Sequence, residues 1–143
     1  TDGLTQLVNR LGYEHYLARL RVPATILMFD VDRFKDVNDC HGHLMGDACL
    51  RTIANCIRRA YGNYGTCFRI GGDEFCVILT RRNAQYNTMT EIFQHLMDAA
   101  RAENPVLPTV SVGCSHFHPS TDDLAESLAR ADAQMYQNKE AHR

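Results

Sequence analysis

The chain has 143 residues, of which 45% are apolar and 22% are charged, and its formal net charge at pH 7 is −2. This length accommodates one domain with a real hydrophobic core and is too short for two. The weak negative charge argues against nucleic acid as a partner, and no apolar stretch approaches the roughly 20 residues of a membrane span.

The first part of the chain predicts a helix and then a buried strand. Residues 4–20 have a weak amphipathic pattern, typical of a short helix. Residues 25–32 form a continuous apolar run that ends in carboxylates, which predicts a strand buried on both faces. Asp30 and Asp32 then lie at or near the carboxyl end of this strand, where α/β proteins commonly bind ligands.

A helical turn at residues 34–38 and a longer helix follow. The loop 41–43, with a central glycine, separates them. The longer helix ends near residues 61–62 and carries Cys49 and Cys56 on one face, which suits small buried hydrophobes. Its apolar stripe recurs at helical spacing and consists of Leu50, Ile53, Ala54 and Ile57.

A hairpin is predicted next, with strands at 66–70 and 74–80. The glycine pair 71–72 is a strong signal for a two-residue turn, because glycine enters φ > 0 conformations without steric cost. Such a turn would place Asp73 and Glu74 at its tip. Adjacent carboxylates repel, so a site that keeps both ionised usually holds a cation. Alone, this motif would be interpreted as an ordinary hairpin with two solvated acids.

The second half predicts helix, strand and helix. Residues 88–91 fit a capping box that opens a helix. Residues 109–114 alternate like a half-buried strand, and residues 122–139 form the last helix. The apolar stripes, which we assign to core packing, are Met89, Ile92, Leu96 and Ala99 in the first helix and Leu124, Leu128, Ala131 and Met135 in the last.

This order of elements predicts an α/β fold of the α+β sandwich type. Its centre is a ferredoxin-like β-α-β-β-α-β arrangement with additional helices. In that arrangement the first strand and the hairpin are neighbours, so Asp30 approaches Asp73 and Glu74. Converging carboxylates suit Mg²⁺, which prefers a few carboxylates together with substrate phosphates. Paired metals about 3.5–4 Å apart would support in-line displacement at phosphorus.

The six cysteines form no C-x-x-C pair, and no signal peptide opens the chain. We therefore expect free thiols in a reducing, cytoplasmic environment. The pairs His41–His43 and His116–His118 lack a partner at a familiar zinc spacing. Surface or structural roles are expected for most of the histidines.

Five ordered blocks carry a family resemblance. Residues 2–10 match D-x-L-T-x-L-x-N-R, residues 30–39 match D-x-D-x-F-K-x-x-N-D, residues 42–47 match G-H-x-x-G-D, residues 69–75 match R-x-G-G-D-E-F, and residues 111–113 and 131–139 match the closing segments. In this order the blocks resemble the GGDEF domain, the catalytic unit of diguanylate cyclases. The resemblance covers nearly the whole chain and implies a fold similar to nucleotidyl cyclase and polymerase palm domains.

The resemblance implies a task for each matching residue. Mg²⁺, for which Mn²⁺ is a substitute, would be held by Asp30, the Val31 carbonyl and Asp73, with Glu74 in a supporting or second-metal role. Asp73 would also be the catalytic base, while lysines neutralise charge on the phosphates. The implied GTP-binding residues are Phe34, Lys35, Asn38, His43, Asp47, Lys139 and Arg143. Among them, Asn38 and Asp47 would read the guanine edge, and Lys35 and Lys139 would act in catalysis with Asp73.

The implied reaction condenses two GTP molecules into cyclic di-GMP and releases two pyrophosphates. Each 3′-hydroxyl attacks the α-phosphate of the other nucleotide, so two domains face each other across a two-fold axis. We expect residues 1–143 to be one domain, the C-terminal module of a longer bacterial second-messenger protein. A sensory or dimerising region would precede it, and any membrane anchor would belong to that region.

Two positions depart from the family pattern. Many relatives carry an R-x-x-D product-inhibition site, and here the corresponding residues 62–65 bear no charge. We therefore predict that the primary inhibitory site is absent. His142 replaces a common glycine before Arg143.

The sequence is compatible with three functions. The alternative to an active diguanylate cyclase is a catalytically inactive module that binds GTP or a protein partner. A third is a related cyclase that makes a mixed or adenine-containing dinucleotide, or a class III nucleotidyl cyclase relative. Degenerate copies usually lose the signature or the strand carboxylate, both of which are intact here, and Asp47 favours guanine. The sequence thus favours an active nucleotidyltransferase.

Overall fold

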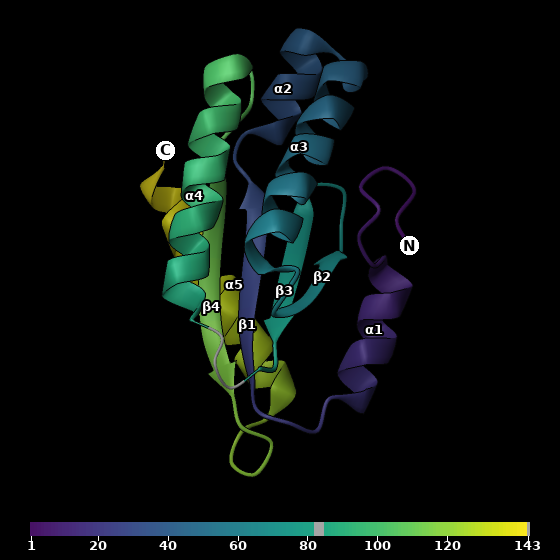
Figure 1. Cartoon of the computed structure of the whole chain (residues 1–143), viewed down its shortest axis with the longest axis vertical. Helices are drawn as coiled ribbons and strands as arrows, with labels where there is room; N and C mark the ends of the chain where they lie inside the picture. Colours follow the sequence, from purple (N-terminus) through teal and green to yellow (C-terminus); the bar gives the residue numbers. More distant parts are fainter. Residues whose placement is uncertain (82–84, 143) are drawn as a thin grey trace.

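The chain folds around a four-stranded antiparallel sheet with the order β2-β3-β1-β4 (Figure 1). This computed structural model describes residues 1–81 and 85–142. The elements are α1 (Arg10–Arg19), β1 (Ala24–Val31), α2 (Phe34–His41), α3 (His43–Tyr61), β2 (Gly65–Arg69), β3 (Glu74–Leu79), α4 (Tyr86–Glu103), β4 (Val110–Phe117) and α5 (Leu124–Ala141).

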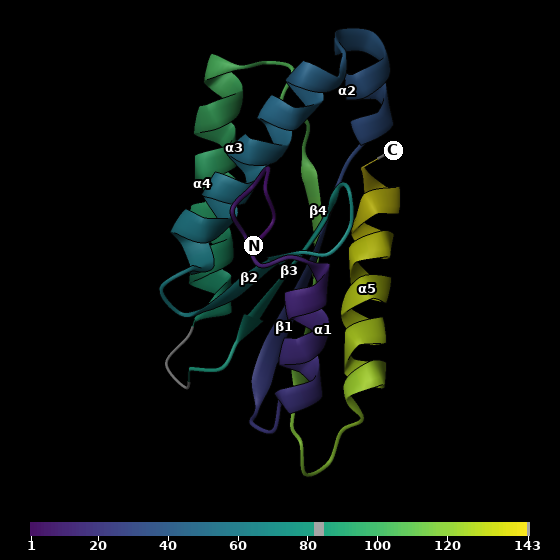
Figure 2. The ribbon, with the colours of Figure 1, turned by 90° about the vertical axis from the view of Figure 1, so that its right-hand side faces the viewer.

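The strand order confirms the ferredoxin-like prediction. The first β-α-β unit contains β1 and β2, and the second contains β3 and β4. In the sheet, β3 lies between β1 and β2, and β1 lies between β3 and β4, as in the ferredoxin-like fold. The helices α3 and α4 cover one face of the sheet, and α1 and α5 cover the other (Figure 2). Among the described helices, none is long and apolar enough to cross a membrane.

β1 is buried on both faces, as its apolar run predicts. Phe29 faces the core under α3 and α4, where its ring centroid lies 5.6 Å from that of Tyr61 and 5.4 Å from that of Phe93. Ile26 and Met28 face the second core, under α1 and α5. The pleat sends alternate side chains to opposite faces, so both helical layers hold this strand in place.

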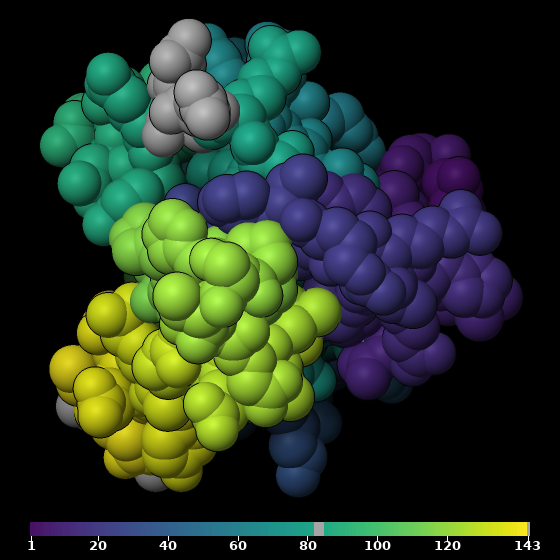
Figure 3. All heavy atoms as spheres, turned by 90° about the horizontal axis from the view of Figure 1, so that it is seen from below, coloured from purple at the N-terminus to yellow at the C-terminus, as the bar shows by residue number. Residues whose placement is uncertain are grey.

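Figure 3 shows the molecule from the end at which β1 begins. The segment that leads into β1 lies there beside the loop between β4 and α5, in agreement with the pairing of Ala24 with Phe117. The carboxyl end of β1 therefore lies at the other end of the molecule. The chain enters α2 there, and the last turn of α5 reaches the same level (Figure 2).

Helix boundaries differ from the predictions where side chains cap the ends. α1 begins at Arg10 rather than at residue 4, because the Asn9 side chain accepts a hydrogen bond from Gly12 N at 2.9 Å. The predicted turn at 34–38 extends to His41. Gly42 then separates α2 from α3. Its φ of +85° is a conformation that favours glycine.

The predictions for α4 are partly wrong. The helix begins at Tyr86, after Gln85 at its N-cap, so residues 88–91 lie inside the helix and form no capping box. Its buried side chains are Met89, Phe93 and Met97, whereas Ile92 is 44% exposed and Ala99 is also exposed. The stripes predicted for the other two helices hold: α3 buries all four of its residues, and α5 buries Ala131 and Met135 with its two leucines half-buried.

Gly113 allows α5 to lie directly on β4. A β-carbon at this position would overlap the backbone of α5 at the Ala131 carbonyl and the Met135 amide. We expect Gly113→Ala to lower the free energy of unfolding by about 2–3 kcal/mol, measured by urea denaturation, because helix and strand must separate. Gly72→Ala is the control, since open space surrounds that position, and its effect should stay below about 0.5 kcal/mol. Equal losses in the two variants would contradict this account.

Candidate functional site

Three segments meet at the carboxyl end of β1. The β1–β3 pairing places Asp30 opposite Glu74, and the Val31 amide donates to the Asp73 carbonyl at 3.1 Å. From α5, the Lys139 ammonium lies 3.2 Å from Asp30 Oδ2 and donates to the Val31 carbonyl at 3.1 Å. The structure thus brings together the four predicted metal-binding residues and one of the two predicted catalytic lysines.

The turn that carries Asp73 is not the predicted two-residue turn. The amides of Ile70 and Gly71 both donate to the Glu74 carbonyl, at 3.0 and 3.3 Å. Among the described glycines, a positive φ occurs at Gly42 and not in this turn. Glu74 is the first residue of β3 rather than part of a tip. The wider loop brings Asp73 beside β1.

An arginine that the sequence analysis left without a role holds this turn. Arg69 donates to the carbonyls of Gly71 and Gly72, at 3.2 and 2.7 Å, and forms an ion pair with Asp2 at 3.1 Å. Partial burial raises the pKa of Asp2, but hydrogen bonds from Thr5 and the charge of Arg69 outweigh it and hold that pKa below its usual value. The N-terminal loop and the signature turn are therefore one hydrogen-bonded unit.

Asp30 is the electrostatic centre of the site. Burial, followed by the charge of Asp73, raises its pKa from 3.8 to about 6, while Lys139 opposes the shift and Glu74 adds to it. Its Oδ1 atom is buried and has no hydrogen-bond partner among the described residues. A buried carboxylate with one unpartnered oxygen favours an additional cation.

These donors fit a hard divalent cation. The Asp30 carboxylate and the Val31 carbonyl are oxygen ligands of the type that Mg²⁺ prefers, and the unpartnered Oδ1 is free to coordinate. Within residues 1–81 and 85–142, no three His, Cys, Asp or Glu side chains already converge as a complete cage. The metal thus stays a prediction that the donor set supports, with the remaining ligands to come from substrate or water.

Asp32, two residues along the chain, has a different environment. Its carboxylate accepts hydrogen bonds from the hydroxyls of Thr109 and Ser111, both at 2.6 Å, and lies 2.9 Å from His142 Nδ1. It is 7% exposed. Asp32 therefore joins β1, β4 and the end of α5, a role that the D-x-D spacing alone does not reveal.

The residues predicted to bind the nucleotide base lie on α2 and α3. Asn38 and Asp47 are half-buried, and His43 is exposed at the first turn of α3. A β-carbon at Gly46 would overlap Asn38 Oδ1 and come within 3.3 Å of the Phe34 ring, so glycine here lets the Asn38 amide lie against α3. Phe34, Asn38 and Gly46 thus meet between the two helices.

Two of the predicted residues remain, Lys35 and Arg143. Lys35, on α2, is exposed and makes no hydrogen bond or ion pair within the described part of the chain. Arg143 lies outside the described residues.

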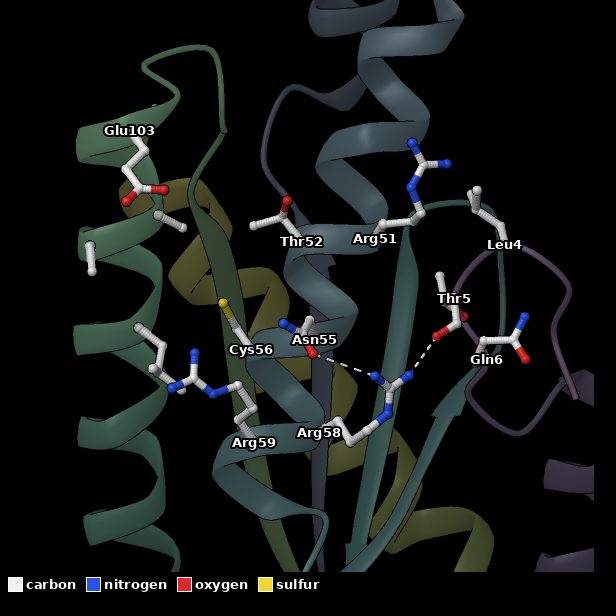
Figure 4. A pocket seen from close by; sticks show the side chains of 13 residues that line it. Leu4, Thr5, Gln6, Arg51, Thr52, Asn55, Cys56, Arg58, Arg59 and Glu103 are labelled. Atoms are coloured by element: carbon white, nitrogen blue, oxygen red, sulfur yellow. Dashed lines mark hydrogen bonds between the residues drawn. The ribbon is translucent and has the colours of Figure 1, made fainter.

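A hollow of about 590 Å³ lies elsewhere, between α3, α4 and the N-terminal loop (Figure 4). Three arginines line it, but Arg59 extends toward α4 and Arg51 toward Leu4. The third, Arg58, donates to the Thr5 carbonyl at 2.6 Å. Because these guanidinium groups do not converge, we assign no ligand to this hollow.

The chain matches a known family along its whole length. The family model described as "Diguanylate cyclase, GGDEF domain" matches residues 1–143. A diguanylate cyclase of Vibrio cholerae is 33% identical over 97% of this chain and 46% of the relative. The diguanylate cyclase DgcZ of Escherichia coli is 34% identical over 99% of this chain and 51% of its own length. The chain thus spans about half the length of these relatives.

Solved structures agree with the fold. The GGDEF domain of DgcB from Caulobacter crescentus, in complex with c-di-GMP, has a TM-score of 0.80 and 26% identity, over 100% of this chain and 91% of that chain. The diguanylate cyclase SiaD of Pseudomonas aeruginosa, in complex with its activator SiaC, has a TM-score of 0.78 and 29% identity, over 98% of this chain and 58% of that chain.

The raised pKa of Asp30 generates a stability prediction. The folded protein binds this proton more tightly than the unfolded chain does, so stability falls as the pH rises from about 4 through 6. We expect Asp30→Asn to raise the free energy of unfolding of the metal-free protein by about 1 kcal/mol at pH 8, after allowance for solvent screening, and to give no gain below pH 4.

Denaturant titrations of the wild type and of Asp30→Asn, at pH 8 and at a pH below 4, measure this difference in the free energy of unfolding. Glu91→Gln, at an exposed position of α4, is the control and should change neither value. A stabilisation by Asp30→Asn that is equal at both pH values would contradict the assignment.

Proposed function

The chain belongs to the GGDEF family of diguanylate cyclase domains, and from this premise we propose that it condenses two GTP molecules into cyclic di-GMP. The observation that carries the proposal is the meeting of Asp30, the Val31 carbonyl and the 73–74 carboxylates with a lysine at one strand end. Such a site combines oxygen donors for a cation with a mobile positive charge for phosphates.

The proposed chemistry is two symmetric displacements at phosphorus. In each, a 3′-oxygen forms a bond to the α-phosphorus of the other GTP, and the bond to the departing pyrophosphate breaks. Asp73 takes the proton of the 3′-hydroxyl, while Lys35 and Lys139 neutralise charge on the phosphates. When bound, Mg²⁺ supplies positive charge at the triphosphate and lowers the pKa of the attacking hydroxyl. Asp30, Val31 and Asp73 would hold it, with Glu74 in support.

The proposed base pocket lies between α2 and α3. Asp47 would accept from guanine N1–H and N2–H₂, donors that adenine lacks, and the Asn38 amide would bond the same edge. Phe34 and His43 would flank the base, and the close approach of Asn38 to Gly46 supports this arrangement. The pocket would thus select GTP over ATP.

Catalysis would require a homodimer. One chain carries one set of these residues, so each domain would hold one GTP and present its 3′-hydroxyl to the partner across a two-fold axis. Alignment of the two nucleotides would supply much of the rate. The relatives are about twice as long as this chain, which is compatible with a further region that would pair two such domains.

A forced dimer tests the activity. We expect the chain, fused to a dimerising coiled coil, to convert GTP with Mg²⁺ into cyclic di-GMP, resolved by chromatography. Asp73→Asn should lower turnover by about 100-fold or more without loss of folding, because the proposed base is removed. A folded dimer that binds GTP but forms no product would instead support a non-catalytic GTP-binding module.

Product inhibition through residues 62–65 should be absent. The segment Gly62-Asn63-Tyr64-Gly65 offers neither the arginine nor the aspartate of an R-x-x-D clamp. We expect added cyclic di-GMP to inhibit initial rates only in competition with GTP. A non-competitive component that disappears in Asn63→Ala would contradict this.

A further inference from the structure

Lys139 contacts the carboxylate and the backbone carbonyl that the proposed function assigns to the metal. Its ammonium lies 3.2 Å from Asp30 Oδ2 and 3.1 Å from the Val31 carbonyl, and it is 3.9 Å from Asp32 Oδ1. Among the described residues it is thus the cation paired with the Asp30 carboxylate, whose other oxygen, Oδ1, has no hydrogen-bond partner. With its side chain 22% exposed, this is a half-buried contact rather than a solvated surface pair.

The end of α5 is fixed around this lysine. The Gln134 side chain accepts from the Cys114 amide and the Asn138 side chain donates to the Val112 carbonyl, both at 2.6 Å. One residue beyond the helix, His142 Nδ1 lies 2.9 Å from Asp32 Oδ2. The helix therefore holds the root of the Lys139 side chain at the strand end, and only the four-carbon stem is left to move.

We propose that, in the nucleotide-free protein, the Lys139 ammonium is an internal cation that occupies the metal position until nucleotide phosphates draw it away. The inference rests on the proposed function, because it takes the metal ligands and the phosphate role from there. It adds a regulation of the site: the divalent cation and the nucleotide bind cooperatively, and the metal alone binds weakly.

The physical reason is competition between two cations for the same carboxylate and the same carbonyl. A magnesium ion binds its ligands at about 2.0–2.1 Å, so an ammonium on the same carboxylate and carbonyl is displaced or strongly repelled. Lys139 loses two favourable contacts when it leaves, and a triphosphate offers it new anionic partners. Each ligand then raises the affinity of the other by the same factor.

Removal of the Lys139 charge distinguishes two roles: a lysine that competes with the metal, and a lysine that only attracts the phosphates. With Mn²⁺ as the probe and free Mn²⁺ measured by electron paramagnetic resonance at pH 8.5, we expect nucleotide-free Lys139→Met to bind the ion at least about fivefold more tightly than the wild type. The gain arises because the competing cation is gone. Asp30→Asn should abolish this binding, which locates the ion measured.

The cooperativity between Mn²⁺ and the nucleotide should be weaker in Lys139→Met, although its affinity for Mn²⁺ alone is higher. A non-hydrolysable GTP analogue should raise the affinity of the wild type for Mn²⁺ by a larger factor than that of Lys139→Met, with a difference of at least about fivefold. The interaction of Mn²⁺ with the analogue in free solution is common to both proteins and cancels in the comparison.

Lys35→Met is the matched control. Lys35 is also proposed to contact the phosphates, but it makes no described contact with Asp30 or Val31. Its loss should weaken analogue binding and leave nucleotide-free Mn²⁺ affinity within twofold. Unchanged or weaker Mn²⁺ binding by folded Lys139→Met would overturn the proposal, as would retention of binding in Asp30→Asn.

These measurements involve no turnover, so they separate the two claims. A protein that binds Mn²⁺ as described but forms no cyclic di-GMP as a dimer would contradict the proposed function and leave the internal cation in place. An active cyclase whose Lys139→Met variant shows no gain in Mn²⁺ affinity would do the reverse.

Discussion

The antiparallel pairing of β1 with β3 is the constraint on which the site depends. It places Asp30 opposite Glu74, and the bond from the Val31 amide to the Asp73 carbonyl continues the pairing into the turn. Backbone hydrogen bonds thus fix the backbones of the three acidic residues side by side at this strand end. Since burial and the charge of Asp73 disfavour the ionised form of Asp30 and raise its pKa, this strand end favours positive charge whether or not a ligand is bound.

Two aspartates at the carboxyl end of β1 have different roles, because their surroundings differ. Asp32 has both oxygens satisfied by the hydroxyls of Thr109 and Ser111 and by His142, so it fastens β4 and α5 to β1. Asp30 has one oxygen against a lysine and the other unpartnered, with its pKa raised to about 6. The saturated carboxylate stabilises the frame, and the unsaturated one is available for ligands.

Local pattern was enough to predict the strands, most apolar stripes and the neighbouring positions of Asp30 and the 73–74 carboxylates, because these follow from periodicity and topology. Long-range contacts decided the features that were wrong or missed. The turn at 70–73 takes its shape from Arg69 and its ion pair with Asp2, a partner 67 residues away along the chain. The buried face of α4 is set by where Phe93 meets Phe29. The contact with Asp2 leaves no periodic signal, whereas the buried face of α4 does, because Met89, Phe93 and Met97 recur every four residues.

The packing of α5 against β4 determines which part of the site can move. Gly113 brings the helix backbone against β4, and hydrogen bonds from Gln134 and Asn138 tie two of its turns to that strand. A shift of the whole helix would break these contacts together, whereas rotation of a lysine stem breaks only its two bonds at the strand end. Exchange of the internal charge therefore needs no backbone movement. A rigid scaffold with one mobile ammonium can respond to phosphates while the carboxylates stay in place.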